Sequence, residues 1–309
     1  MSRRAVILFL SLGLAWGIPY MFIKVAGEEL SPSVLVLART ALAALLLVPI
    51  TLLSRRHRAA VPRVLQHWKA VAAYTVVEVA LPWVALNHAE QRLSSSTAAI
   101  LISAVPVVGV VIALITRRAE KLGRRGGFGL LLGTAGVAAL VGLDVNVSDL
   151  SAVAEMGVVV LGYAIGPVIL SRYLGDLPGL PVVTVSIVLA ALIYLPVVLL
   201  GPGLPSQMPS AKVLVAVGVL AVVCTAVAFL LLFALIGELG PVRATTIVYV
   251  NPVVAVIGGA LFLGEKVTLW TVLGFGLVLT GSYLVNGTRR PAGPAAPAVP
   301  DPGRELQTA

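Results

Sequence analysis

The chain consists largely of apolar runs of about 20 residues that are separated by short connections. A helix rises about 1.5 Å per residue, so a run of this length crosses the roughly 30 Å hydrocarbon core of a bilayer. Hydrophobic residues make up 59% of the sequence and charged residues only 11%, which is far more apolar than a soluble domain. The sequence therefore predicts an all-α polytopic membrane protein.

Ten such runs are present, and we predict that each forms one transmembrane helix. They cover residues 5–24, 33–53, 68–87, 94–116, 127–143, 153–172, 180–200, 212–236, 242–263 and 268–286. The first run follows two arginines as a signal peptide would, but no convincing small-residue cleavage site comes after it, so we expect it to be retained. Residues 287–309 are rich in proline and alanine and are predicted to be a disordered cytoplasmic tail.

The net charge of +9 is distributed in short basic clusters between the apolar runs. With both termini in the cytoplasm, seventeen of the 22 lysines and arginines lie on the inner side and four on the outer side. Such a bias is typical of orientation in a membrane rather than of nucleic-acid binding. We predict a multi-pass protein of the cytoplasmic (inner) membrane, with both termini inside, lipid around it and no nucleic-acid partner.

Sequence landmarks recur at nearly one offset along the chain. They are Pro106 and Pro252 (146 apart), Glu120 and Glu265 (145 apart), GFGLLL at Gly127 and GFGLVL at Gly274 (147 apart), and the GxxxG motifs Gly13–Gly17 and Gly162–Gly166 (149 apart). We predict two five-helix repeats, residues 1–143 and 144–286. An odd number of spans per repeat inverts the second repeat relative to the first, an arrangement typical of transporters with a midplane site.

The paired GxxxG motifs lie in the first and sixth predicted spans. Glycines at this spacing allow two helix backbones to approach closely. We predict that both spans pack tightly, each against the opposite repeat.

Two blocks carry a family resemblance. ALNHAEQRLSSSTAAILISAVPVVGVVIALI, followed by AEKL, resembles the end of a first EamA-type repeat of the drug/metabolite transporter superfamily. FALIGELGPVRATTIVYVNPVVAVIGGALFLGEKVTLWTVLGFGLVLTGSYLV resembles the same block of the second repeat more closely, because RAEKL replaces the expected LGEK in the first copy. The resemblance covers residues 5–286. It implies a ten-helix carrier of small metabolites, often amino acids and related solutes, with export slightly favoured.

Four prolines stand at matched positions inside predicted spans: Pro19, Pro106, Pro167 and Pro252. A proline frees the carbonyl four residues earlier, and hydrocarbon offers no water to satisfy it. Because the four occupy matched positions in the repeats, we predict helix kinks that shape a central cavity or hinge. The alternative is that they bend the helices without any ligand contact.

Two charges lie well inside predicted spans, away from their ends. Glu78 stands near the centre of the third span, where an acidic group costs a few kcal/mol, and is predicted to carry a coupling proton or to bind a substrate amine. Arg39 lies in the second span and could bind a substrate carboxylate or extend outward to the interface. The alternative is a purely structural role for Glu78, as a partner for Arg39 or for a helix dipole.

Aromatic and amide side chains near the kinks and span ends complete the substrate-binding candidates. They are Trp16, Tyr20, Trp83, Asn87, Tyr163, Tyr249 and Asn251. Tyrosine and tryptophan are also common interfacial anchors, so each alone fits a structural role. Asn251 stands out because an amide deep in a membrane needs hydrogen-bond partners.

No enzyme signature accompanies these candidates. The single cysteine, Cys224, excludes an intrachain disulfide, and the sequence has no metal-ligand spacing and no Walker A motif. We predict no metal, no cofactor and no catalysis, but a secondary transporter that moves small polar metabolites, amino-acid-like solutes above all, by alternating access. The alternative is a non-transporting membrane sensor or interaction subunit; the sequence carries no signal for oligomeric state.

Overall fold

A computed structural model describes residues 2–115, 124–144, 150–201, 205–239, 247 and 250–286, and these residues form helices and no strands. The first half contains α1 (Arg3–Gly17), α2 (Pro19–Ala26), α3 (Pro32–Leu53), α4 (Arg55–Gln66), α5 (Trp68–Tyr74), the π-helix η1 (Thr75–Ala80), α6 (Leu81–Ala89), α7 (Ser95–Ile102), α8 (Val105–Ile115) and α9 (Arg124–Asp144). The second half contains α10 (Leu150–Tyr173), α11 (Gly179–Leu200), α12 (Ala211–Ala221), the π-helix η3 (Val222–Val227), α13 (Ala228–Leu239), α15 (Asn251–Phe262) and α16 (Leu269–Asn286).

Seven segments of the described chain are long and apolar enough to cross a membrane. They are Arg3–Ala26, Pro32–Leu53, Trp68–Ala89, Ser95–Ile112, Leu150–Tyr173, Gly179–Leu200 and Ala211–Leu239. The remaining predicted spans fall on α9, α15 and α16, of which α15 and the apolar part of α16 are shorter than a full crossing. The all-helical membrane class is therefore confirmed, whereas the number ten stays a prediction.

The GxxxG motifs pack across the two halves of the chain. Gly13 and Gly17 of α1 lie against Val250 and Val254 at the start of α15. Gly162 and Gly166 of α10 lie against η1 and α6 of the first half, so closely that a Cβ on Gly162 would overlap the carbonyl oxygen of Val77. The predicted packing of the first and sixth spans against the opposite half is confirmed.

The prolines do not all act alike. Pro19 begins α2 directly after α1 ends, Pro106 is the second residue of α8 just after α7 ends, and Pro252 is the second residue of α15. Pro167 lies inside α10, which continues through it as one helix. A proline is tolerated in the first turn of a helix because that N–H has no intrahelical partner. Helix breaks thus accompany the predicted kinks at Pro19 and Pro106, and α15 begins next to Pro252.

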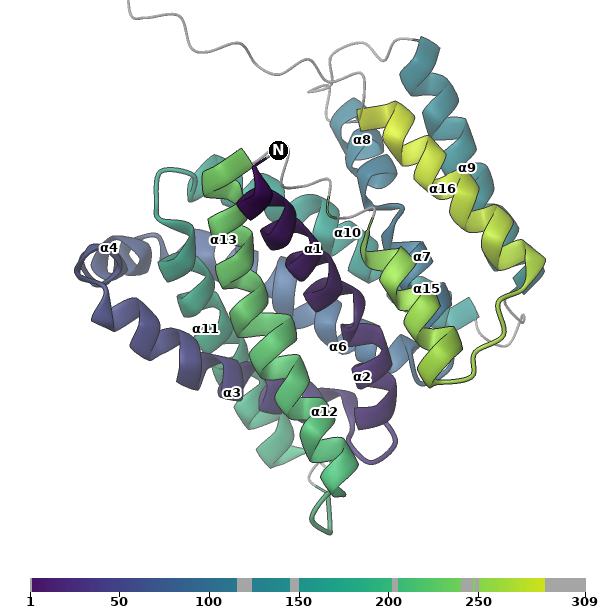
Figure 1. Cartoon of the computed structure of the whole chain (residues 1–309). Coiled ribbons are helices and arrows are strands. Elements are labelled where there is room, and N and C mark those ends of the chain that lie inside the picture. Colours follow the sequence, from purple (N-terminus) through teal and green to yellow (C-terminus); the bar gives the residue numbers. More distant parts are fainter. Residues whose placement is uncertain are drawn as a thin grey trace, which may run out of the picture.

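The largest buried cluster lies where α2, α3, α7, α10 and α12 meet, and includes Ile23, Leu35, Ile100, Met156 and Leu220. Beside it, α9 and α16 run side by side next to α8 (Figure 1). The backbones of Gly133 and Gly281 touch in that pair. The polar residues discussed below lie in the main bundle and not in the α9–α16 pair.

Candidate functional site

Arg39 is buried in α3 and is engaged on three sides. Its Nε donates to the hydroxyl of Thr225 at 2.8 Å, and its Nη2 lies 3.5 Å from the carbonyl oxygen of Cys224. Its guanidinium carbon lies 3.8 Å from the centre of the Trp83 ring. A cation over an indole face gains electrostatic stabilisation, and more of it when water is excluded. Arg39 therefore does not extend outward to the interface; it joins α3 to α6 and to η3.

The π-helix η3 positions the hydroxyl that Arg39 contacts. Thr225 donates to the carbonyl of Leu220, five residues earlier, at 2.8 Å, and it accepts from Arg39 with the same oxygen. The wider turn of a π-helix gives i to i+5 geometry and is often found at functional sites. The second half thus offers a polar anchor to an arginine of the first half.

Two tyrosines lie around this arginine. Tyr20 and Tyr163 are within electrostatic range of each other, of Arg39 and of Glu90, and Trp83 lies in hydrogen-bonding reach of the Tyr163 hydroxyl. Tyr163 packs against both apolar clusters that flank the site. Four of the predicted binding residues, Tyr20, Arg39, Trp83 and Tyr163, are therefore brought together.

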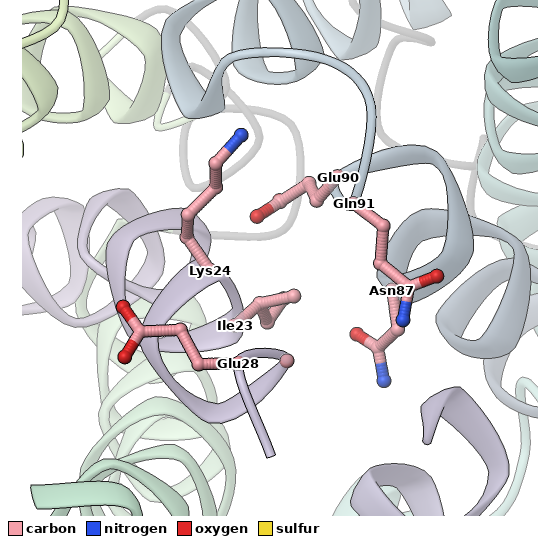
Figure 2. Close-up of a pocket in the computed structure, with 7 residues that line it drawn as sticks. Ile23, Lys24, Glu28, Asn87, Glu90 and Gln91 are labelled. Carbon is pink, nitrogen blue, oxygen red and sulfur yellow. The ribbon is translucent and has the colours of Figure 1, made fainter. Parts of the chain in front are cut away.

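A cavity of about 340 Å³ lies at the end of the bundle that is predicted to face outward, and its described lining includes none of these four residues. It is lined by Ile23, Lys24, Gly27, Glu28, Asn87, Glu90 and Gln91. Figure 2 shows the side chains of Lys24 and Glu90 extending toward the same space. Asn87, a predicted site residue, forms part of its wall, and its side-chain oxygen has no partner among the described residues.

Glu90 is the functional candidate that the sequence reasoning missed. Its side chain is buried, with 1% of the residue exposed, and neither carboxylate oxygen has a hydrogen-bond partner in the described part of the chain. Burial raises the pKa of this carboxyl well above its ordinary value, although nearby Lys24 acts against the shift. Lys24 itself donates to the carbonyl of Leu93 at 2.6 Å. The sequence signal that could have identified Glu90 is its position three residues after Asn87, because this spacing places both side chains on one helix face.

Glu78 occupies a separate place from Arg39. It lies in η1, where its carboxylate touches Gly166 of α10, and its Oε2 is buried without a partner among the described residues. It is within electrostatic range of Tyr74 and Tyr163. The described ion pairs do not include one between Glu78 and Arg39, so the two groups are not paired with each other in this structure.

The other predicted residues lie elsewhere. Trp16 packs edge to face on Phe229 of α13, with ring centres 6.1 Å apart, in the apolar contact between α1 and α13. Asn251 begins α15 next to Gly17, and its side-chain oxygen is buried without a partner in the described chain. Tyr249 lies outside the described residues. Trp16 is therefore a packing residue, while Asn251 marks a second polar position between the halves.

Glu265 joins the halves at the rim of the bundle. It accepts hydrogen bonds from the backbone N–H and the hydroxyl of both Ser95 and Ser96, at 2.6–3.1 Å. Gly264 precedes it with φ of 65°, a backbone conformation that glycine adopts without steric cost. Partial burial opposes ionisation, but the four hydrogen bonds prevail and hold the pKa of Glu265 below its ordinary value. The carboxylate thus accepts from the first two N–H groups of α7, while Ser94 is the N-cap residue and accepts from the N–H of Thr97.

Metal chemistry has no obvious place in this arrangement. The described residues contain no group of three histidine, cysteine, aspartate or glutamate side chains that could hold an ion. The polar groups that the site brings together are a buried cation and two separated buried carboxyls, next to aromatic surfaces.

Comparison with known proteins agrees with this chemistry. The model of the EamA-like transporter family matches residues 3–142 and again residues 152–287. An uncharacterized transporter from Archaeoglobus fulgidus is 26% identical over 281 residues, which is 87% of this chain and 94% of that protein. A solved crystal structure matches with a TM-score of 0.65 at 16% identity, over 91% of this chain and 96% of its own, which shows a shared fold.

The fold and these matches define a multi-pass membrane transporter, with lipid as its surroundings and a small molecule as its solute. More particularly, the chain belongs to the EamA-like transporter family. The family resemblance drawn from the two sequence blocks is confirmed.

Proposed function

We propose that the protein is a secondary transporter that moves a small zwitterionic metabolite, such as an amino acid, across the cytoplasmic membrane. The observation that carries the proposal is a pair of opposite charges in the bundle: Glu90, which lines the cavity and is buried without a partner among the described residues, and Arg39, which is stacked on Trp83 behind the cavity lining. Each lies within electrostatic range of the other without forming an ion pair in the described structure. A solute carboxylate would bind Arg39 and its ammonium group would bind Glu90.

The energetics favour a ligand that satisfies both groups. An unpaired carboxylate in a buried site costs several kcal/mol, so Glu90 takes a proton or a cation when water is excluded. Arginine presents a planar fork of N–H donors that matches a carboxylate. Trp83, Tyr20 and Tyr163 supply apolar surface for the rest of the solute.

The transport cycle that we propose is alternating access, with both termini in the cytoplasm and export favoured. The packing of each GxxxG helix on the opposite half supports it, because smooth glycine surfaces allow one half to rock against the other. Glu78, at the contact of η1 with Gly166, is the proposed carrier of the coupling proton. A carboxyl that is buried without a partner can be neutral on one side of the cycle and ionised on the other.

Counterflow in proteoliposomes tests the function. Proteoliposomes that contain the purified protein are loaded with one unlabelled solute, and uptake of the same solute in labelled form is measured. The test is repeated across a panel of amino acids, amines and organic acids. We expect saturable exchange of a zwitterion and weak exchange of the amine or acid that carries only one of its charges. Exchange of organic acids alone would remove Glu90 from binding, and silence across the panel with folded protein would favour the sensor reading.

A further inference from the structure

A strongly basic surface surrounds α4, at the predicted cytoplasmic end of the bundle. It comprises Arg55, Arg56, Arg58, Arg63 and Lys69, all exposed. No aspartate or glutamate occurs between residues 54 and 77, and none of the five has an ion-pair partner in the described part of the chain. Five like charges are thus held close together without internal compensation.

The helix that carries them is fixed in place by its opposite face. Val64 and Ala60 are buried, and Val64 packs in a cluster with Leu174, Leu177 and Val182 at the ends of α10 and α11. Figure 1 shows α4 at the edge of the bundle, next to α3 and α11. The basic surface is therefore held rigidly where the spans α3 and α5 end and begin.

Large apolar side chains lie exposed beside the charges. Leu65 is 54% exposed and Trp68 62% exposed, and Lys69 lies with its ammonium 5.7 Å from the centre of the Trp68 ring. A helix with arginines on its polar face and leucine and tryptophan next to them suits the boundary between headgroups and acyl chains. Water would solvate the arginines but would leave Leu65 and Trp68 with exposed apolar surface.

The second half of the chain shows that the fold does not require this helix. There α11 and α12 are connected by residues 201–210, which contain no lysine or arginine and, over the described 205–210, no helix. We propose that α4, with Trp68 and Lys69, is a binding surface for the headgroups of anionic phospholipids. Arginine guanidinium groups bind phosphate oxygens through two parallel N–H bonds, while Leu65 and Trp68 enter the upper acyl region.

Lipid binding to the purified full chain tests this surface. Native mass spectrometry would measure retention of phosphatidylglycerol and of phosphatidylcholine by the wild type and by the variant R55Q/R58Q/R63Q. The matched control is R124Q/R125Q/R172Q, which removes three exposed arginines on the same predicted side. We expect the preference for phosphatidylglycerol to fall about tenfold or more in the α4 variant and less than about twofold in the control. Equal losses in both variants, or none in the α4 variant, would overturn the proposal.

Two further arms separate lipid binding from misfolding and from binding of soluble anions. R55K/R58K/R63K keeps the charge but loses the two parallel N–H bonds, and we expect its preference for phosphatidylglycerol to lie between those of the wild type and the glutamine variant. A Lys variant that melts like the wild type but has lost as much preference as the glutamine variant would overturn an electrostatic lipid site. Inorganic phosphate at constant ionic strength should leave phosphatidylglycerol bound. Displacement of the lipid by inorganic phosphate would assign the arginines to a soluble anion and overturn the proposal.

Discussion

The two π-helices of the described chain, η1 and η3, lie at equivalent positions in the two halves, but they carry different chemistry. η1 begins at Thr75 and η3 at Val222, an offset of 147, which also relates α3 to α11, each 22 residues long with an internal proline at Pro49 or Pro196. Within this register Glu78 of η1 corresponds to Thr225 of η3. Thr225 binds Arg39, whereas the buried Oε2 of Glu78 has no partner among the described residues.

The helices that pack against the π-helices, α3 against η3 and α11 against η1, differ in a similar way. Arg39 of α3 corresponds to Ser186 of α11, whose hydroxyl donates to Val182 in its own helix. The two halves therefore share a backbone, while the first supplies a cation and an acid where the second supplies two hydroxyls. The comparison teaches that the polar contact across the halves is made at η3, where Thr225 accepts from Arg39, but not at η1, where the buried Oε2 of Glu78 has no partner among the described residues.

Replacing Arg39 should give the largest loss of transport. The experiment tests whether Arg39 of the first half contributes more to transport than the corresponding Ser186 of the second half. In Arg39→Ala the anionic end of the solute loses its charged partner, and we expect counterflow to fall about a hundredfold or more. Ser186→Ala removes only a hydroxyl that is bonded within its helix and should stay within about twofold of wild type. Similar rates for the two variants would mean that Arg39 is a structural residue.

Glu78→Gln sharpens the comparison at η1. Glutamine keeps the shape but cannot release a proton, so we expect proton-driven accumulation to disappear while solute exchange remains measurable. The two activities are measured in the same proteoliposomes, with and without an imposed pH gradient. Unchanged accumulation in this variant would exclude Glu78 as the proton carrier.

Glycine substitutions test whether η1 is held as tightly as its contact with α10 indicates. A Cβ at Gly162 would overlap the Val77 carbonyl and lie 2.6 Å from Pro82, whereas one at Gly157 meets nothing within 4 Å. We expect Gly162→Ala to lower the free energy of unfolding by about 1–3 kcal/mol. Gly157→Ala should raise it by up to about 1 kcal/mol through helix propensity. Thermal melting in detergent measures both, and equal melting temperatures would contradict the close contact.

Sequence and structure agree best where periodicity and steric rules decide. Apolar runs predict the helices, and repeated glycines predict the packing across the halves, because both depend on local spacing. The partner of Arg39 could not be predicted, since Thr225 lies 186 residues away and is presented by a π-helix that has no propensity signature. Glu90 was missed because it follows the span end, where a carboxylate is expected to be solvated; its burial depends on neighbouring helices.

The pKa values of Glu90 and Glu265 are shifted in opposite directions, so the stability of the protein should depend on pH in two distinguishable ways. The pKa of Glu90 is raised, so the stability of the wild type should fall as pH rises from the ordinary glutamate range through the pKa of the folded state. Glu90→Gln removes this loss, so its melting temperature should rise increasingly above that of the wild type as pH rises.

The pKa of Glu265 is lowered, so Glu265→Gln should be least stable relative to wild type near neutral pH. Its stability should approach that of the wild type as pH falls through the acid range. A pH-independent difference for either variant would contradict its assignment.

Thr225→Val should have the smallest effect on transport, and it tests the hydrogen bond between Arg39 and Thr225 directly. Valine has nearly the volume of threonine but removes the oxygen that accepts from Arg39 and donates to Leu220. One such hydrogen bond contributes about 1 kcal/mol, so we expect KM to rise about fivefold with little change in expression. In a double-mutant cycle with Arg39→Lys, which keeps the charge but loses the fork geometry, the two losses should not add, because each removes the same contact. Full additivity would mean that Thr225 acts only within η3, and that Arg39 is held in place by Trp83 instead.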